Sequence, residues 1–126
     1  PSTHPVIVLQ EADPPYRELR IPIGGAEGVA IAYAARQVPT PRPLTHQLIS
    51  SILDSYGLDL DAVQITRVDG ANFTAELVLS GPSGVRTVDC RPSDGIALAL
   101  RRRISVPIMA APSVLDIASI GSAGGN

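Results

Sequence analysis

The stretch that decides the fold is VDCRPSDGIALAL, residues 88–100. We expect residues 85–90 to form a strand that leads into it. Arg91 precedes a proline, so its backbone is pushed towards an extended conformation. Pro92 suits the first turn of a helix, where the missing N–H is not needed. The residues that follow are apolar nearly all round, which predicts a mostly buried helix that runs to about Arg103.

The rest of the chain reads as short strands and helices on either side of this junction. Strands are expected at residues 5–11, 17–23, 62–68, 72–79 and 105–109, and helices at 26–36, 44–56 and near 113–119. Asp69-Gly70 is typical of a tight hairpin turn. The pattern predicts one α+β domain over residues 1–120, with a mixed or antiparallel sheet packed with about three main helices. Residues 121–126 read as a flexible tail.

Residues 44–56 carry the clearest amphipathic pattern. Their apolar side chains recur three and four positions apart, at Leu48, Ile49, Ile52, Leu53 and Tyr56. Thr45 is a ready N-cap, and Gly57 is well placed as the C-terminal stop. We therefore expect a helix with one apolar face.

The composition limits which classes of protein the chain can belong to. The 126 residues are 44% hydrophobic, which is enough for one domain with its own core. The single cysteine, Cys90, cannot form an internal disulfide, which fits a reducing compartment. A net charge of -2 and 3% aromatic residues are not typical of proteins that bind nucleic acid through their global field. Without a membrane-length apolar run or a basic-apolar leader, we expect a soluble, cytoplasmic protein with no membrane partner.

The strand-to-helix junction allows two interpretations. In the structural one, Ser93 or Asp94 satisfies free N–H groups of the helix, and Asp89 pairs with Arg91 on one face of the strand. In the functional one, Asp89 and Asp94 converge on a divalent cation such as Mg²⁺, which prefers oxygen ligands. Such an ion could activate water against a phosphodiester.

Three further features carry a structural and a functional interpretation each. His46 is either a hydrogen-bonded structural residue or a general acid/base, with Arg42 steadying a phosphate. Glu27 follows a Gly-Gly turn at a helix start. Either its charge complements the helix dipole, or the turn holds an anion on its backbone N–H groups, in which case Glu27 would repel a phosphate unless a metal intervened. The run 101–103 is three arginines, which form either a solvated helix cap or a patch that contacts phosphate.

Five segments then occur together in one order between about Pro5 and Leu115. They are LRIPIG at 19–24 followed by Glu27, RPLTHQL at 42–48, FTA at 73–75, RPSDGIALALR at 91–101 and VPI at 106–108. In this order they resemble the bifunctional nuclease domain family, whose own patterns include RPLTHDL and RPSDAIALALR. RPLTH and RPSD…IALALR at this spacing are specific motifs.

The resemblance implies an α+β fold that self-associates, and an activity of cleaving RNA and DNA. It also implies motif positions in this chain, namely Glu27, Arg42, Thr45, His46, Asp89, Arg91, Ser93 and Asp94. In the enzyme hypothesis His46 moves protons and is catalytic together with the carboxylates of Asp89, Asp94 and Glu27. These three carboxylates would hold the divalent metal.

The same hypothesis gives the remaining motif positions to the substrate. Arg42 and Arg91 would neutralise its phosphate, and Thr45 and Ser93 would also bind it. RNA or DNA and a second copy of the chain are the expected partners.

Departures from the family pattern leave a second hypothesis open. Gln47 stands where the family has an aspartate, and Gly95 stands where it has an alanine, so activity is expected to be reduced or absent. The protein would then be a non-catalytic oligomeric binding or regulatory module, in which the motifs are buried architecture. In that case Asp89→Ala should cost several kcal/mol, because it leaves a buried arginine unpaired.

Overall fold

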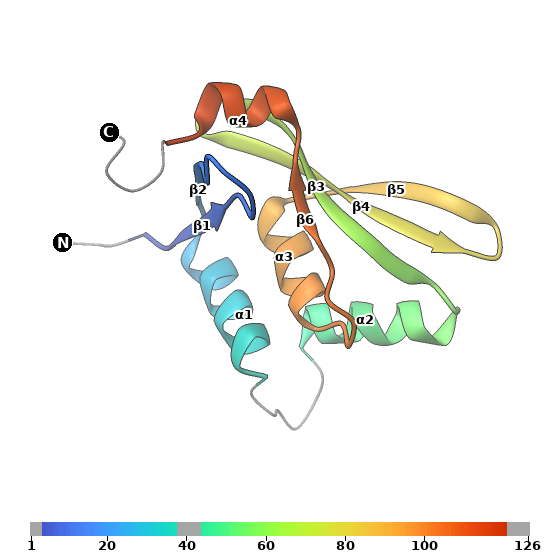
Figure 1. Cartoon of the computed structure of the whole chain (residues 1–126). Helices are drawn as coiled ribbons and strands as arrows, with labels where there is room; N and C mark the ends of the chain where they lie inside the picture. The colour runs from blue at the N-terminus through green and yellow to red at the C-terminus, as the bar shows by residue number, and fades with distance from the viewer. Residues whose placement is uncertain (1–3, 38–43, 121–126) are drawn as a thin grey trace.

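Helix α3, Pro92–Leu100, lies at the centre of the fold (Figure 1). The structure is a computed structural model and describes residues 4–37 and 44–120. Six of the nine residues of α3 are buried, as its apolar sequence predicts. The helix ends at Leu100 rather than 103, because its last turn closes at Arg101, whose N–H donates to the carbonyl of Leu98. The three arginines therefore lie at and beyond its end.

Two sheets surround this helix. The larger one has the strand order β5-β4-β3-β6, formed by Gly84–Cys90, Asn72–Gly81, Asp59–Asp69 and Ile108–Ala110. Strand β4 is antiparallel to β3 and β5, whereas β6 is parallel to β3. The second sheet is the hairpin of β1, Val6–Gln10, and β2, Glu18–Pro22. The α+β class with mixed and antiparallel strands is confirmed, and the division into two sheets is what the sequence pattern did not show.

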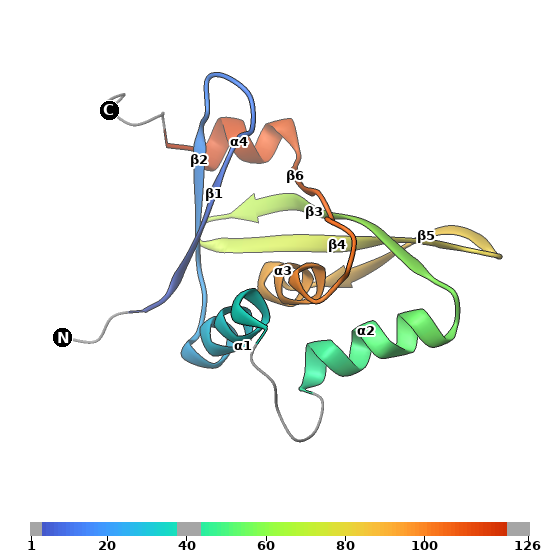
Figure 2. The ribbon, with the colours of Figure 1, turned by 60° about the horizontal axis from the view of Figure 1, so that its bottom comes forward.

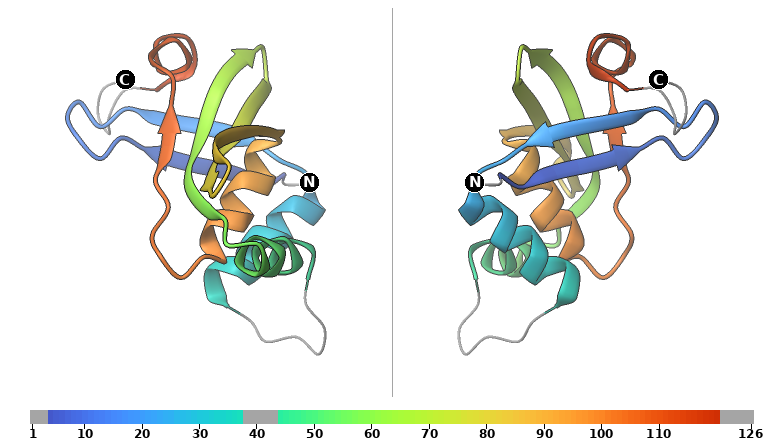
Figure 3. Two further views of the ribbon diagram at one scale, coloured as in Figure 1. Left: turned by 90° about the vertical axis from the view of Figure 1, so that its right-hand side faces the viewer. Right: turned by 90° about the vertical axis from the view of Figure 1, so that its left-hand side faces the viewer.

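Three helices lie along one side of the larger sheet (Figure 2). They are α1, Gly25–Arg36, α2, Thr45–Ser55, and α3. The β1–β2 hairpin crosses the direction of β3 and β4 (Figure 3), and short α4, Pro112–Ala118, lies near it. Glu18 of β2 and Ile120 exchange two backbone hydrogen bonds of 2.8 and 2.7 Å, which fasten the chain beyond α4 to the hairpin. Within the described ranges no helix has both the length and the apolar character that crossing a membrane requires.

The hydrophobic core has two parts that share α3. In one, Ile96 of α3 packs with the hairpin, the middle of the larger sheet and Val114 of α4. In the other, Leu98 of α3 packs with Leu53 of α2 and with Val63 of β3. A helix that contributes to both parts cannot shift without disturbing each of them, so the start of α3 is held firmly in place.

Helix α2 packs on the core through only part of its apolar face. Leu53 is buried and Ile49 is partly buried against the core, as expected. Leu48, Ile52 and Tyr56 are instead 51%, 48% and 74% exposed. The expected N-cap is also displaced by one residue, since Leu44 holds the cap position and Thr45 is the first residue of the helix. The helix thus leaves an apolar stripe on the surface.

The arginine run does not form a simple solvated cap. The Arg102 side chain is only 11% exposed. Its guanidinium donates to the carbonyl of Ser50 at 2.9 Å, to Ser50 Oγ at 2.8 Å and to Asp54 Oδ1 at 2.9 Å. Both partners belong to α2, so this arginine joins the end of α3 to α2 rather than remaining in solvent.

The packing of α3 against β3 predicts that Gly95→Ala destabilises the fold. A Cβ at Gly95 would lie 2.6 Å from Cγ1 of Val63, which is buried and unable to move away freely. Although alanine favours helices, we expect overpacking to lower the free energy of unfolding by about 1–3 kcal/mol. Urea denaturation measures this free energy. Gly25→Ala is the matched control because its Cβ meets no atom within 4 Å. Equal stability of Gly95→Ala and the wild type would contradict the close contact.

Candidate functional site

Side chains from the first turns of three helices meet around Asp94. Glu27 belongs to the first turn of α1, His46 to that of α2 and Asp94 to that of α3. His46 Nε2 lies 3.0 Å from Asp94 Oδ1. These residues are far apart in the sequence, and the two motifs RPLTHQL and RPSDGIALALR each supply one member of the pair.

Arg91 connects the remaining members of the cluster. Its Nε and Nη2 donate to the two oxygens of Asp94 at 2.8 and 2.9 Å, and its Nη1 donates to Glu27 Oε2 at 3.1 Å. The two parallel bonds to Asp94 form a bidentate pair, which fixes the guanidinium plane as well as the charge. The Arg91 side chain is 62% exposed, whereas those of Glu27 and Asp94 are 25% and 31% exposed. The guanidinium is therefore held by carboxylates and still open to solvent.

These contacts determine which protonation states are favoured. Hydrogen bonds from Arg91 are the main reason that the pKa of Asp94 is lowered; partial burial opposes this effect, and His46 adds to it. The pKa of Arg91 is raised by the same pair. Asp94 is thus ionised at neutral pH and can only accept hydrogen bonds. It follows that Nε2 of His46 donates the proton in this contact, and that a neutral ring carries its lone pair on Nδ1.

A surface hollow of about 690 Å³ opens beside this cluster. Arg91 and Asp94 line it together with Arg67, Phe73 and Thr74. A hollow of this size is large enough for a nucleotide-sized group. The sequence motifs did not place Arg67 at this hollow, although the hairpin predicted at Asp69-Gly70 fixes which residues of the two strands lie side by side. A hairpin that turns there pairs Arg67 with Thr74, next to Phe73.

Asp89 lies in the same hollow but not in the ion-pair cluster. It is exposed on β5, directly opposite Glu76 of β4. The prediction that Asp89 forms an ion pair with Arg91 is wrong. Arg91 lies beyond the strand, at the N-cap of α3, and bonds to Asp94 and Glu27 instead. The hypothesis of a non-catalytic module, in which Asp89 pairs with a buried Arg91, loses that pair for the same reason.

The other predicted site residues are placed less favourably. Thr45 is exposed at the first position of α2. Ser93 is buried in the first turn of α3, with 4% of its surface exposed, so it is not open to a substrate. Arg42 and the tail at 121–126 lie outside the described residues.

The carboxylates around Arg91 do not fit a divalent cation. Among residues 4–37 and 44–120, no three histidine, cysteine or acidic side chains are grouped in a way that could hold a metal ion. Both oxygens of Asp94 and one of Glu27 accept hydrogen bonds from Arg91. A cation bound between these two carboxylates would face the guanidinium charge, which is unfavourable. The metal site formed by Asp89, Asp94 and Glu27 stays a prediction.

Cys90 ends β5 at the edge of the hollow and packs against both parts of the core. Burial raises the pKa of its thiol to about 11, and the negative charge of Asp94 adds to the effect. A thiol with this pKa stays protonated at neutral pH and is a poor nucleophile. Cys90 is therefore a packing residue rather than a reactive one.

Comparison with known proteins places this arrangement in a family. A family model described as the bifunctional nuclease domain matches residues 7–123. The chain belongs to the bifunctional nuclease domain family. The resemblance drawn from the five sequence segments is thereby confirmed.

Proteins with similar sequences come from a bacterium and from plants. An uncharacterised protein of Mycobacterium tuberculosis is 38% identical over 120 residues, which are 95% of this chain and 70% of that protein. Bifunctional nuclease 1 of Arabidopsis thaliana is 30% identical over 110 residues, which are 85% of this chain and 34% of that protein. Bifunctional nuclease 2 of Oryza sativa is 29% identical over a segment of the same length. This chain thus matches about a third of each of these two plant proteins.

The ion-pair cluster predicts different effects for its two neighbouring aspartates. Asp94→Asn should lower the free energy of unfolding by about 1–3 kcal/mol at pH 7, because Arg91 and His46 lose an ionised acceptor. Asp89→Asn should leave it unchanged or slightly higher, because it removes a charge opposite Glu76. Urea denaturation of both variants measures the difference. Equal losses would show that the cluster does not stabilise the fold.

The ion pair of Asp94 with Arg91 also predicts that the stability of the fold depends on pH. Because the folded-state pKa of Asp94 is lowered, its contribution is fully present above the unfolded value of about 4. The contribution is lost as the pH falls through the lower folded value. The gap in stability between the wild type and Asp94→Asn should therefore shrink in acid, and a gap that stays constant from pH 7 to acid would contradict the assignment.

Proposed function

We propose that the protein is a nuclease-like phosphodiesterase that acts on RNA or DNA, with His46 as the group that moves protons. The observation that carries the proposal is the contact of His46 with an ionised Asp94 beside an open hollow that also exposes Arg91. Membership of the family supports it, as do relatives that bear the name bifunctional nuclease.

His46 is arranged as a general base supported by a carboxylate. Its ring is 15% exposed, and Asp94 binds the proton on Nε2, so the proton of an attacking water or ribose hydroxyl would pass to Nδ1. The attacking oxygen then bonds to phosphorus while the bond to the leaving oxygen breaks, and the imidazolium returns a proton to that oxygen. The negative charge of Asp94 stabilises the imidazolium between these two steps.

The hollow supplies groups that suit a nucleotide phosphate and its base. Arg91 and Arg67 both line it and are the cations that can meet a phosphate. Phe73 is the aromatic side chain of the hollow, on which a base can stack. Glu76 and Asp89 repel phosphate, so we place the phosphate near the arginines and away from these carboxylates.

The proposal is tested by His46→Ala, with His4→Ala as the matched control. His4 is an exposed histidine near the start of the described chain, outside the hollow. Loss of a general base should slow cleavage of labelled RNA or single-stranded DNA by about 10²–10⁴-fold, whereas the control should match the wild type. Equal cleavage by all three proteins would identify a contaminating nuclease and remove the proposal. Running each reaction with excess Mg²⁺ and with a chelator also tests the predicted metal.

A second candidate function is a non-catalytic oligomeric module. The observation that favours it is an exposed apolar stripe, formed by Leu48 and Ile52 of α2 and by Tyr56 at its C-cap, at a spacing of four residues. An exposed apolar stripe on a helix is typical of a surface that binds another protein. We infer that a second copy of the chain would cover it, in keeping with the self-association that the family resemblance implies.

Ile52→Asp tests the self-association. A charge in the middle of the stripe should shift the chain to the monomer in analytical ultracentrifugation, with little loss of stability, because Ile52 is already 48% exposed. Ser51→Asp adds the same charge at the next, exposed position of α2 and should leave the mass unchanged. A monomeric wild type, or an Ile52→Asp variant that still self-associates, would contradict an interface on α2.

A further inference from the structure

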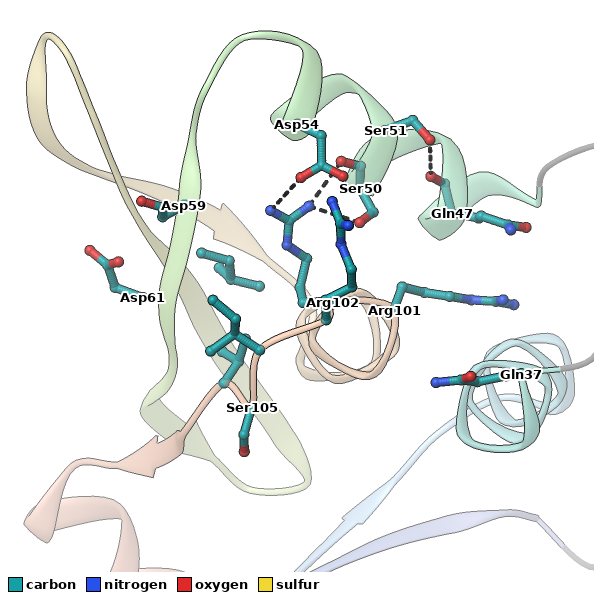
Figure 4. A pocket seen from close by; sticks show the side chains of 14 residues that line it. Gln37, Gln47, Ser50, Ser51, Asp54, Asp59, Asp61, Arg101, Arg102 and Ser105 are labelled. Atoms are coloured by element: carbon teal, nitrogen blue, oxygen red, sulfur yellow. Dashed lines mark hydrogen bonds and ion pairs between the residues drawn. The ribbon is translucent and has the colours of Figure 1, made fainter.

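A larger pocket lies at the other end of α3, away from the His46–Asp94 contact. It occupies about 1300 Å³ between α2, the end of α3, the start of β3 and the end of α1. Figure 4 shows that its two ends differ in charge. The Arg101 side chain extends towards the gap between Gln47 of α2 and Gln37 at the end of α1, whereas Asp59 and Asp61 lie at the opposite end.

Of the three arginines in this pocket, Arg102 is not available to a ligand. Its guanidinium is occupied by Ser50 and Asp54, so it forms part of the wall. Arg101 and Arg103 also line the pocket, and neither forms an ion pair with another residue in the described ranges. The arginine end therefore holds positive charge that is not neutralised within the described part of the chain.

Two polar atoms at this end lack hydrogen-bond partners. Nε of Arg101 and Oε1 of Gln47 are both buried and make no hydrogen bond with any residue that the structure describes. Buried polar atoms without partners are rare because each one loses its hydration without compensation. A ligand that lets Arg101 turn towards an acceptor, and that gives Gln47 a donor, removes this cost. A nucleotide offers both, as phosphate oxygens and as hydroxyl or amino groups.

We propose that the arginine end of this pocket binds a phosphate of a nucleotide or nucleic-acid strand, as a second subsite of the proposed phosphodiesterase. The inference rests on that proposed function for the class of ligand. His46 contacts Asp94 at the start of α3, and the adjacent Gln47 lines the pocket at its end. Arg91 and Arg101 are the two cap residues of α3, ten residues apart, or about 15 Å along the helix. One strand can thus reach Arg91 and Arg101 together.

The charge pattern also gives the bound group a direction. Asp59 and Asp61 repel a second phosphate, so the arginine end takes the phosphate and the acidic end faces hydrogen-bond donors of the sugar or base. Asp61 accepts a hydrogen bond from Ser80 Oγ at 3.0 Å, which holds its carboxylate in place for such a role.

Arg101→Gln, with Arg86→Gln as the matched control, tests the subsite. Arg86 is exposed on β5 and lines neither pocket, so its replacement removes the same charge elsewhere. Binding is measured by fluorescence anisotropy with a labelled phosphorothioate single strand, which resists cleavage. We expect Arg101→Gln to weaken binding about tenfold or more, as for loss of a charged hydrogen bond. The slope of log K against log salt should also fall by about 0.7 for the lost phosphate contact.

The control and a second pair of variants keep the test decisive. Equal weakening by Arg101→Gln and Arg86→Gln would reduce the effect to overall charge and overturn the subsite. If Arg101→Gln does not fold, Arg101→Lys should keep most of the binding and Arg103→Gln should weaken it; wild-type binding by Arg103→Gln would then overturn the proposal.

Competitors distinguish the two sources of phosphate. Displacement by a nucleoside monophosphate assigns a terminal nucleotide, and displacement by the unlabelled strand alone assigns a backbone phosphate. Binding is scored separately from cleavage. A protein that binds through Arg101 but never cleaves would remove only the proposed enzyme, whereas His46-dependent cleavage with unchanged binding by Arg101→Gln would remove only the subsite.

Discussion

Helix α3 lies so close to β3 that residue 95 has no room for a side chain. The space that a Cβ would need at Gly95 is taken by Val63, and Ile96 and Leu98 of the same helix hold the two parts of the core together. This contact sets the position of the first turn of α3, and therefore of Arg91 and Asp94. The contact of Gly95 with Val63 thus positions the ion-pair cluster and the hollow beside it. It also positions the pocket at the other end of the helix.

Local features of the fold could be predicted from the sequence, whereas features set by distant contacts could not. The strand-to-helix junction at Arg91-Pro92 and the hairpin at Asp69-Gly70 follow from backbone restrictions that neighbouring residues impose. The three arginines were expected to form either a solvated cap or a patch that contacts phosphate. Neither interpretation included the contacts of Arg102, because the sequence around it does not show that α2 offers Ser50 and Asp54 to its guanidinium. The glycine at position 95, where the family has an alanine, is likewise explained only by the distant Val63.

The sequence predicted which residues belong to the candidate site better than it predicted which of them contact one another. Glu27, His46, Arg91 and Asp94 came from motif positions, and the structure brings these four together. Asp89 was assigned to Arg91 because both were placed on one strand face, but the chain bends into the helix between them, and Asp94 is the nearer carboxylate. Arg67 was missed because strand pairing, rather than any motif, brings it to the hollow.

The half-buried Cys90 has a practical consequence for work with this protein. Alkylating reagents attack thiolates, and a pKa of about 11 leaves roughly one molecule in ten thousand in that form at pH 7. Cys90, the single cysteine of these 126 residues, is therefore expected to react only slowly with maleimides at pH 7. A reporter dye can be attached at a newly introduced surface cysteine while the native one is left in place, and the packing around α3 stays intact.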